Sequence, residues 1–380
     1  MFDDSLTDEQ RVLRDAAREF CQRRVVPRAE QFDHDGAIPD DVFSEMAQLG
    51  YFGLRVPESY GGMDCDPIAY TLVIEEFARA CAGLAITISV QNALVCGAIK
   101  NHGTEDQKKA WLPQLVDGAL SAYALTEPGA GTDAGSLRAS ARRSGNEYVL
   151  NGEKCFVTNA SLAKFIVVFA STDLDAGSKG ISAFVVASDT AGIGIGKPER
   201  KLGLRASDTR SISFCDARVP AGSRLGEEGA GYKIALSQLA HGRLGVAAQA
   251  LGIGEAAFAA ARQYARERRQ FGRPIAEFQA IAFKLADMRI KLDASRLLLD
   301  RAVRLQAADK PFAREAAEAK VFASESANWV ANEALQIHGG YGYMVEYPVE
   351  RYFRDARVTT IYEGTSEAQR IVISRAILSQ

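Results

Sequence analysis

The sequence predicts an α+β fold in which two helical regions enclose a β-rich middle region. Apolar residues recur at helical spacing through the first third of the chain. After about residue 121 they give way to short β-branched and aromatic runs bounded by turn residues, and helical spacing returns from about residue 231. We therefore expect a helical domain over residues 1–120, a β domain over residues 121–225 and a second helical domain over residues 226–380.

The first domain opens with a candidate capping box formed by Thr7 and Gln10, and further helices are expected at 66–80, 84–101 and 104–117. Residues 84–99 form its most apolar stretch, interrupted by four polar residues. This stretch is too short and too polar to cross a bilayer of roughly 30 Å. We expect a buried core helix and no membrane insertion.

In the middle domain, two β-rich runs flank Asn151-Gly152, a dipeptide that favours a type I′ hairpin turn. Further strands are predicted at 165–170, 181–187 and 210–214. The last domain carries long Ala/Leu/Arg-rich helical runs at 233–266, 276–306 and 311–337 and a shorter one at 366–378. The long helices are expected to form an antiparallel bundle whose apolar faces suit internal packing and subunit contacts.

Composition excludes several classes of function. The 380 residues carry a formal charge of −3 and give a pI of 6.0, so no general attraction to nucleic acid is expected. The six cysteines are widely spaced and none of the four histidines has a partner at metal-ligand spacing, which predicts reduced thiols, no metal site and a cytoplasmic location. The N-terminus is acidic and polar, and we expect neither a signal peptide nor a transit peptide there.

Four segments are candidates for chemistry, and each also has a purely structural interpretation. Glycines in residues 123–133 suit either a tight loop or a close approach of backbone amides to a ring or phosphate. In residues 336–342, Gly339 suits a helix C-cap, but three glycines beside His338 exceed what a cap requires. The four arginines of residues 266–274 suit a helix C-terminus or a pyrophosphate. In residues 359–367, Glu363 is either a surface charge before a helix capped by Thr365 or Ser366, or a functional carboxylate.

All four segments together resemble the acyl-CoA dehydrogenase family in order and spacing, over essentially the whole chain. Residues 124–133 (ALTEPGAGTD) are similar to the family's first signature, and Gln336, Gly339, Gly340, Gly342, Glu346, Arg351 and Asp355 are similar to its second. The resemblance implies a middle β-sandwich or barrel, a C-terminal four-helix bundle and FAD held between them. It also implies a homotetramer arranged as a dimer of dimers.

Carried over position by position, the resemblance implies the following site residues. The flavin and the adjoining acyl-CoA would be contacted by Tyr123, Leu125, Thr126, Gly131, Thr132, Phe156 and Thr158. The ADP half of FAD would be held by Arg268, Gln270, Phe271 and Gln279, with Gln336, Gly339 and Gly340 coming from a neighbouring subunit, and Thr365 and Glu367 would complete the cofactor site. Glu363 would be the catalytic base, and Thr132, Arg243, Tyr362, Glu363 and Gly364 would contact the substrate.

The resemblance further implies α,β-dehydrogenation of an acyl-CoA, with electrons passed to an electron-transferring flavoprotein in fatty-acid β-oxidation. Some branches of the family carry the base one residue before the arginine that matches Arg243, but Gly242 stands there in this chain. Short or branched-short substrates are favoured. The alternatives are a glutaryl-CoA-type enzyme, which would present an arginine near Ala85, a medium-chain enzyme, or a non-catalytic helical scaffold.

Overall fold

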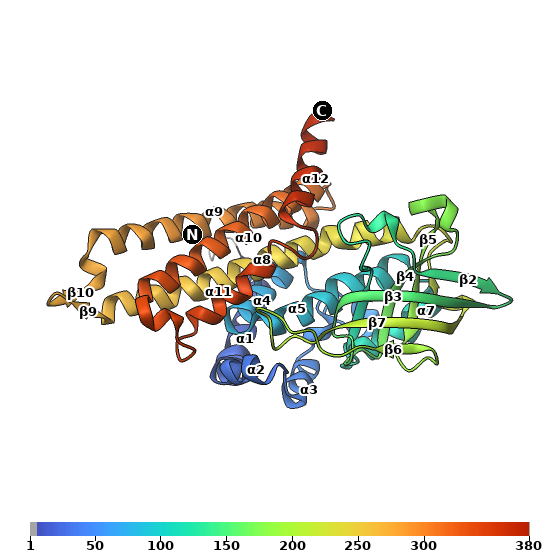
Figure 1. The fold of residues 1–380 in the computed structure, drawn as a ribbon, viewed down its shortest axis with the longest axis horizontal. Coiled ribbons are helices and arrows are strands. Elements are labelled where there is room, and N and C mark those ends of the chain that lie inside the picture. Colours follow the sequence, from blue (N-terminus) through green and yellow to red (C-terminus); the bar gives the residue numbers. More distant parts are fainter. Residues whose placement is uncertain (1–5, 380) are drawn as a thin grey trace.

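The protein is described by a computed structural model covering residues 6–379. A helical region, a sheet and a second helical region follow one another along the chain, as predicted (Figure 1). The sheet lies at one end of an elongated molecule, and the long C-terminal helices run from it to the opposite end (Figure 1). The long helix α8 (Gly231–Glu267) extends along both regions and packs on α4 and α10.

The N-terminal region begins at the predicted capping box, because the Thr7 side chain accepts from the Gln10 amide and the Gln10 side chain accepts from the Thr7 amide. Its α-helices are α1 (Asp8–Phe20), α2 (Ala29–Asp35), α3 (Asp40–Gln48), α4 (Pro67–Ala80), α5 (Ala82–Ser89), α6 (Gly97–His102) and α7 (Glu105–Val116). The predicted helix over 84–101 is present, but it includes the π-helical segment η6 (Val90–Cys96) between α5 and α6.

The middle region forms one sheet of eight strands, in the order β6-β7-β3-β2-β4-β5-β8 with β1 paired to β4. The strands are β1 (Ser121–Ala124), β2 (Ser140–Ser144), β3 (Glu147–Thr158), β4 (Phe165–Ser171), β5 (Ile181–Ala187), β6 (Ile193–Ile195), β7 (Thr209–Pro220) and β8 (Arg224–Leu225). Most neighbours are antiparallel, whereas β1 runs parallel to β4.

Strand β4 joins the sheet to the helices because both of its faces are buried. Ile166 and Val168 pack in the core of the β region, whereas Val167 and Phe169 pack in the core shared with the helices. Strand β5 is also buried along most of its length. This explains the nearly continuous apolar runs at 165–170 and 181–187, since a strand covered on both faces needs no polar alternation.

The hairpin predicted at Asn151-Gly152 is wrong. Both residues lie inside the continuous strand β3, where the register with β7 shifts between Leu150 and Gly152. Gly152 has φ +137°, and a Cβ there would lie 2.7 Å from the Cα of Ala139, so the glycine is required by a bulge and a close backbone approach. The turn between β2 and β3 lies instead at Gly145 and Asn146.

The C-terminal region contains the predicted long helices and one helix that periodicity did not predict. Its helices are α8, α9 (Gln279–Ala307), α10 (Ala313–His338), α11 (Val349–Val358) and α12 (Ser366–Leu378), and the short hairpin β9 (Arg269–Gln270) with β10 (Arg273–Pro274) follows α8. The unpredicted helix is α11, a short element between two glycine-containing turns. Helix α12 projects from the body of the molecule (Figure 1).

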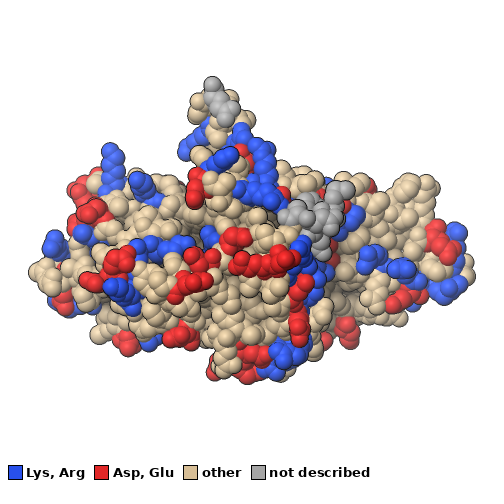
Figure 2. Space-filling model, turned by 180° about the vertical axis from the view of Figure 1, so that it is seen from behind, with Lys and Arg blue, Asp and Glu red and all other residues tan. Residues whose placement is uncertain are grey.

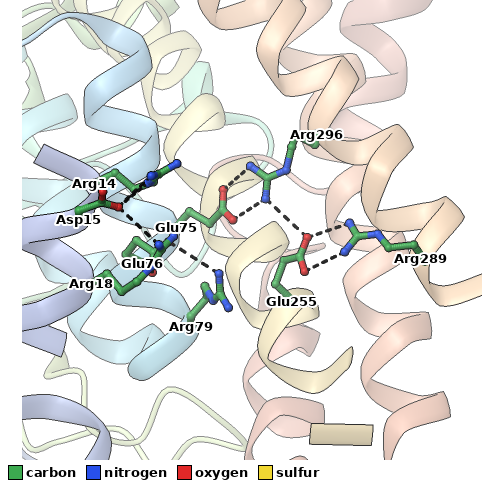
Figure 3. Close-up of polar contacts among 9 residues, drawn as sticks. All are labelled: Arg14, Asp15, Arg18, Glu75, Glu76, Arg79, Glu255, Arg289 and Arg296. Atoms are coloured by element: carbon green, nitrogen blue, oxygen red, sulfur yellow. Dashed lines mark hydrogen bonds and ion pairs between the residues drawn. The ribbon is translucent and has the colours of Figure 1, made fainter. Parts of the chain in front are cut away.

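Partly buried ion pairs connect the N-terminal and C-terminal helices. Arg296 of α9 donates to both carboxylate oxygens of Glu75 on α4, at 2.8 and 2.5 Å, and also lies 3.5 Å from Glu255 of α8 (Figure 3). Arg289 of α9 forms a second bidentate ion pair, in which it donates to both carboxylate oxygens of Glu255. Paired guanidinium and carboxylate groups of this kind fix the relative orientation of three helices.

The expectation that the apolar stretch around residues 84–99 is too short and too polar to cross a bilayer is wrong, because it belongs to the longer helical segment Ala82–His102. This segment and Gly231–Glu267 are long and apolar enough to cross a membrane, but their most apolar windows are 100% and 78% buried in the protein. Buried core helices of soluble proteins meet the same criteria of length and apolarity, so these two segments are weak evidence for a membrane span. All six cysteines are free thiols, four of them buried, as predicted. Acidic and basic side chains are intermingled over the face shown in Figure 2.

Candidate active site

Glu363 lies in a tight turn between α11 and α12. It has φ +53°, and the following Gly364 has φ +88°, so the backbone is left-handed at two consecutive residues. Such a conformation is costly for a glutamate and persists only where the surroundings hold it. Thr365 caps α12 by accepting from the Ala368 amide, as one interpretation of the sequence predicted. A helix cap and an inward-pointing carboxylate therefore occur together in this turn, so the two interpretations do not exclude each other.

The Glu363 side chain points inward although the residue as a whole is half-buried. Its Oε2 atom is buried and has no hydrogen-bond partner among the described residues. A Cβ added to Gly242 of α8 would lie 2.5 Å from this atom, so α8 carries its glycine where the carboxylate passes closest. Burial raises the pKa of Glu363 to about 7, against the lowering effect of Arg243 and Lys320.

Further buried polar groups surround this carboxylate. The Tyr123 hydroxyl on β1 and Nε of Arg243 on α8 are both buried without a hydrogen-bond partner in the described part of the chain. The Tyr362 hydroxyl donates to Gln249 on α8, whose own amide donates to the Ala82 carbonyl at 2.8 Å. Unpartnered buried polar atoms are rare in proteins, and three of them gathered at one place suit a bound ligand that supplies the missing partners.

The glycine-rich segment 125–133 lies beside the end of strand β3. The Cys155 amide donates to the Thr126 carbonyl at 2.9 Å, which brings Thr126 next to Phe156 and Thr158. Lys154, which is fully buried, donates to the Leu125 carbonyl at 2.9 Å and to Glu127 at 2.7 Å.

Glu127 in turn accepts from the Arg138 and Ala139 amides at 2.6 and 2.9 Å. One buried ion pair thus ties the segment to the strand, because the ammonium group holds the Leu125 carbonyl and the carboxylate holds the Arg138 and Ala139 amides, which follow the segment in the chain. The segment is held in place while its glycines stay uncovered.

The surface formed by this segment can accept a flat aromatic ring. A Cβ at Gly129 or Gly131 would meet no atom within 4 Å, so the backbone there faces open space. Phe156 has φ +57° and leaves 68% of its surface exposed at the end of β3. Together with the unpartnered Tyr123 hydroxyl and Glu363 carboxylate, these features fit the isoalloxazine of FAD with an acyl thioester beside it.

A second group of predicted residues surrounds a pocket of 490 Å³ at the opposite end of the molecule. Arg268 and Gln270, from the β9 hairpin, and Gly339 and Gly340, at the end of α10, line this pocket together. Gly339 also forms the predicted helix C-cap, with φ +59°. Phe271 of the hairpin, Gln279 at the start of α9 and Gln336 of α10 are also exposed, and Phe271 is 93% exposed.

Within one chain, Gly339, Gly340, Arg268 and Gln270 line the same pocket. The expectation that Gln336, Gly339 and Gly340 reach the ADP half of FAD from a neighbouring subunit stays a prediction. The pocket is also far from Glu363. Gly242 contacts Glu363, and the rest of α8 leads from there to Arg268 over about 38 Å at the rise of an α-helix.

Four buried residues of the site were not predicted from the sequence. They are Lys320 and Gln369, which hold the Glu363 turn, and Lys154 and Glu127, which hold the glycine-rich segment. A signal existed for Lys320, because it occupies an apolar position of its helix, in line with Ala316, Ala323 and Ala327 at helical spacing. A lysine at such a position indicates a buried partner.

Comparison with known proteins gives the class of the protein. Three family models match in succession: the acyl-CoA dehydrogenase N-terminal domain over residues 7–119, the middle domain over 122–217 and the C-terminal domain over 229–378. The short-chain specific acyl-CoA dehydrogenase of Mus musculus mitochondria is 45% identical over 374 residues, covering 98% of this chain and 91% of that protein.

Solved structures agree. Butyryl-CoA dehydrogenase of Megasphaera elsdenii superposes with a TM-score of 0.96 at 45% identity, covering 98% of this chain and 99% of that one. A chain from a study of the electron transferring flavoprotein of Acidaminococcus fermentans and flavin-based electron bifurcation gives a TM-score of 0.97 at 45% identity, covering 99% of both chains. The fold and site thus define an FAD-dependent oxidoreductase. The chain belongs to the acyl-CoA dehydrogenase family.

Proposed function

We propose that the enzyme converts a short-chain acyl-CoA to the trans-2-enoyl-CoA, with Glu363 as the base that takes the α-proton. The observation that carries this proposal is the buried, unpartnered Oε2 atom of Glu363 beside the open glycine-rich surface. The bond between Cα and one hydrogen breaks and its proton goes to the carboxylate. The β-hydrogen leaves as hydride, so that a carbon–carbon double bond forms and the substrate loses two electrons.

The surroundings of Glu363 make a carboxylate strong enough for this step. An α-hydrogen of a thioester is only weakly acidic, and a general base works best when its pKa lies near the working pH. Burial raises the pKa of Glu363 to about 7, well above the 4.5 of an ordinary glutamate. The Glu363 main-chain N–H is the chain's own donor for the negative charge that develops on the thioester oxygen.

FAD, when bound, supplies the acceptor of the hydride that leaves Cβ. The residues that would hold the flavin are Tyr123, Leu125, Thr126, Gly131, Thr132, Phe156 and Thr158, with Thr365 and Glu367 from the start of α12. Thr126 and Thr158 offer hydroxyl groups for the ring edge. Arg243, Tyr362 and Gly364 would line the substrate side together with Glu363 and Thr132.

The two groups of cofactor residues support a site shared between subunits. Arg268, Gln270, Phe271, Gln279, Gln336, Gly339 and Gly340 lie too far from Glu363 to hold the other half of the same FAD. We therefore propose that they bind the ADP half of the FAD whose flavin lies in a second copy of the chain. Guanidinium groups suit the pyrophosphate, and the open glycines admit it closely.

Exposed apolar surface supports a homotetramer built as a dimer of dimers. Phe283, Ile290 and Leu297 of α9 recur every seven residues and remain 57–65% exposed. The projecting helix α12 also exposes Ile371, Ile377 and Leu378. Apolar helix faces of this kind are typical of surfaces that a further copy of the chain covers.

The remaining assignments follow the family. We propose that an electron-transferring flavoprotein reoxidises the flavin, that the reaction belongs to fatty-acid β-oxidation, and that the enzyme works in the cytoplasm. The named partner is supported by the likeness to a chain from the electron transferring flavoprotein study. Six free cysteines suit a reducing compartment. A short substrate is supported by the relatives named above, which act on short-chain and butyryl thioesters by name.

The substrate class is tested by anaerobic titration of the purified flavoprotein with butyryl-, isobutyryl-, octanoyl- and glutaryl-CoA. Bleaching of the oxidised-flavin absorbance by butyryl- or isobutyryl-CoA at the lowest concentrations supports the short-chain assignment. Preference for octanoyl-CoA would indicate a medium-chain enzyme, and preference for glutaryl-CoA would contradict the argument from Ala85, which is buried on α5. A protein that binds no flavin would support the scaffold interpretation.

A further inference from the structure

Two buried side chains hold the carbonyl groups of the turn that carries Glu363. The Gly364 carbonyl accepts from Nζ of Lys320 at 2.7 Å and from Nε2 of Gln369 at 2.9 Å, and the same Gln369 nitrogen lies 3.1 Å from the Glu363 carbonyl. Lys320 and Gln369 are both 0% exposed. They come from different helices, α10 and α12, and meet at one peptide.

The turn needs such support because of its backbone conformation. Two consecutive residues are left-handed, and one of the two is a glutamate that gains nothing from this conformation. A side chain on such a turn is placed only as accurately as the turn itself. The direction of the Glu363 carboxylate is therefore set by the donors to its backbone.

Lys320 differs from Gln369 in carrying a charge. No carboxylate of the described residues lies within 4.0 Å of its Nζ, so it has no direct ion-pair partner. Burial lowers the pKa of Lys320 to about 8, and Glu363 is the group that most opposes this lowering. The lysine and the proposed base therefore influence each other across the turn without touching.

We propose that Lys320 is a positioning residue for the base: its ammonium group fixes the Glu363–Gly364 turn and its charge favours the ionised form of Glu363. This inference deepens the proposed function and rests on it. A carboxylate that must take a proton from carbon needs both an exact direction and a proton affinity matched to the working pH. One buried lysine supplies both.

The other charged and titratable groups near the turn are few. Arg243 on α8, Tyr123 on β1 and Tyr70 on α4 face Glu363, and Tyr362 precedes it. The charges of Glu367 on α12 and Glu325 on α10 also raise the pKa of Lys320. Arg243 is the second cation near the carboxylate, but the turn's carbonyls accept side-chain hydrogen bonds from Lys320 and Gln369. Among the residues that the structure describes, Lys320 alone combines the contact with the charge.

The test compares Lys320→Met, which removes the donor and the charge, with Lys320→Gln, which keeps a donor without the charge. The rate of anaerobic flavin reduction by butyryl-CoA is measured from pH 5 to pH 9. We expect Lys320→Met to move the acid limb to higher pH by roughly one unit and to lower the plateau rate about tenfold. Lys320→Gln is expected to show the same shift of the limb with a plateau closer to wild type.

The matched control is Lys201→Met. Lys201 also donates to a backbone carbonyl, that of Ser207 at 2.6 Å, and burial also lowers its pKa, but Glu363 does not act on it. We expect its pH profile to match wild type. A Lys320→Met or Lys320→Gln protein with an unmoved acid limb overturns the inference.

If Lys320→Met does not fold, the acid limb of the pH profile of Lys320→Gln tests the inference, because glutamine also lacks the charge of the lysine. If neither butyryl-CoA nor the other thioesters reduce the flavin of the wild-type protein, the proposed function is overturned, and this inference with it. An active wild type with an unmoved limb in the variants would overturn this inference alone.

Discussion

Oε2 of Glu363 lies 2.5 Å from the position that a Cβ at Gly242 would occupy. The second-nearest atom to that position is the carboxylate carbon Cδ of Glu363 at 3.0 Å, and Cδ2 of Leu94 follows at 3.1 Å. Helix α8 thus gives up a side chain where the carboxylate passes, although glycine inside a helix is unfavourable by roughly 0.5–1 kcal/mol relative to alanine. The glycine makes room for the proposed base.

Gly242→Ala is expected to lower the rate of flavin reduction by at least tenfold without destabilising the protein. The added methyl group displaces the end of a flexible side chain, which can rotate away, and alanine favours the helix. Single-turnover reduction by butyryl-CoA and thermal unfolding of the same sample measure the two effects. Normal activity in this variant would show that the carboxylate does not work in the observed position.

Gly252→Ala serves as the opposite control on the same helix. A Cβ there would lie 2.4 Å from the Glu75 carbonyl oxygen, which is backbone and cannot move aside. We expect lower stability by roughly 1–3 kcal/mol, with the activity of the folded enzyme retained.

The pKa of Glu363 also predicts how stability depends on pH. The folded protein holds this proton up to about pH 7, whereas the unfolded chain loses it near the ordinary value of 4.5. The wild type therefore loses stability as pH rises from about 4.5 to 7, and the loss is complete above that range.

Glu363→Gln removes this dependence, so its advantage over wild type should grow from pH 5 to pH 8, by at most about 3 kcal/mol. Thermal unfolding of both proteins at the two pH values measures it. An advantage that does not change with pH would contradict the raised pKa.

The buried pair of Lys154 and Glu127 should matter for cofactor retention. Lys154→Met leaves the Glu127 carboxylate buried without its cation, which costs roughly 3–5 kcal/mol. We expect lower thermal stability and a protein that loses FAD on dilution, because the glycine-rich segment is released. The double variant with Glu127→Gln should recover part of the stability.

The control for this pair is Arg218→Met, which breaks an exposed ion pair with Glu147 on the same sheet. It should change stability by less than about 1 kcal/mol and leave FAD binding intact. If Lys154→Met and Arg218→Met changed stability and FAD retention equally, the buried pair would have no special role.

A shared cofactor site predicts complementation between two inactive variants. Glu363→Gln lacks the base but keeps the Arg268 pocket, whereas Arg268→Glu lacks the pocket but keeps the base. In a mixed dimer one of the two sites combines the intact half of each subunit. Because about half of the dimers that form on co-expression are mixed, the total preparation should recover roughly a quarter of the wild-type activity per subunit. No activity in purified mixed oligomers would mean that each FAD is held within one chain.

Much of the fold was predictable from local patterns. The capping box at Thr7, the strand over Ile181–Ala187 and the helix Ser366–Leu378 all follow from residues close in sequence. The prediction of a turn at Asn151-Gly152 was wrong because the same dipeptide also suits a bulge. The close approach of the Ala139 backbone, which is distant in sequence, favours the bulge. Helix α11 was missed because it is short and amphipathic over only ten residues.

The site was predictable only in part, because its members come from distant parts of the chain. Motif resemblance could name Glu363 and Thr126, since each lies in a contiguous signature. Lys320 and Gln369 carry no such signature, and only the packing of α10 against α12 brings them to the Glu363 turn. The placement of Gly339 beside Arg268 likewise follows from the long helices and not from spacing.

The central claim is that Glu363 removes the α-proton, and it is tested most directly by comparing wild type with Glu363→Gln in anaerobic single-turnover mixing with butyryl-CoA at pH 8. The account predicts that the variant retains FAD and still binds the thioester, but that its flavin reduction slows by at least about 10²-fold. Reduction of the variant's flavin at the wild-type rate would contradict the account and assign the proton to another group.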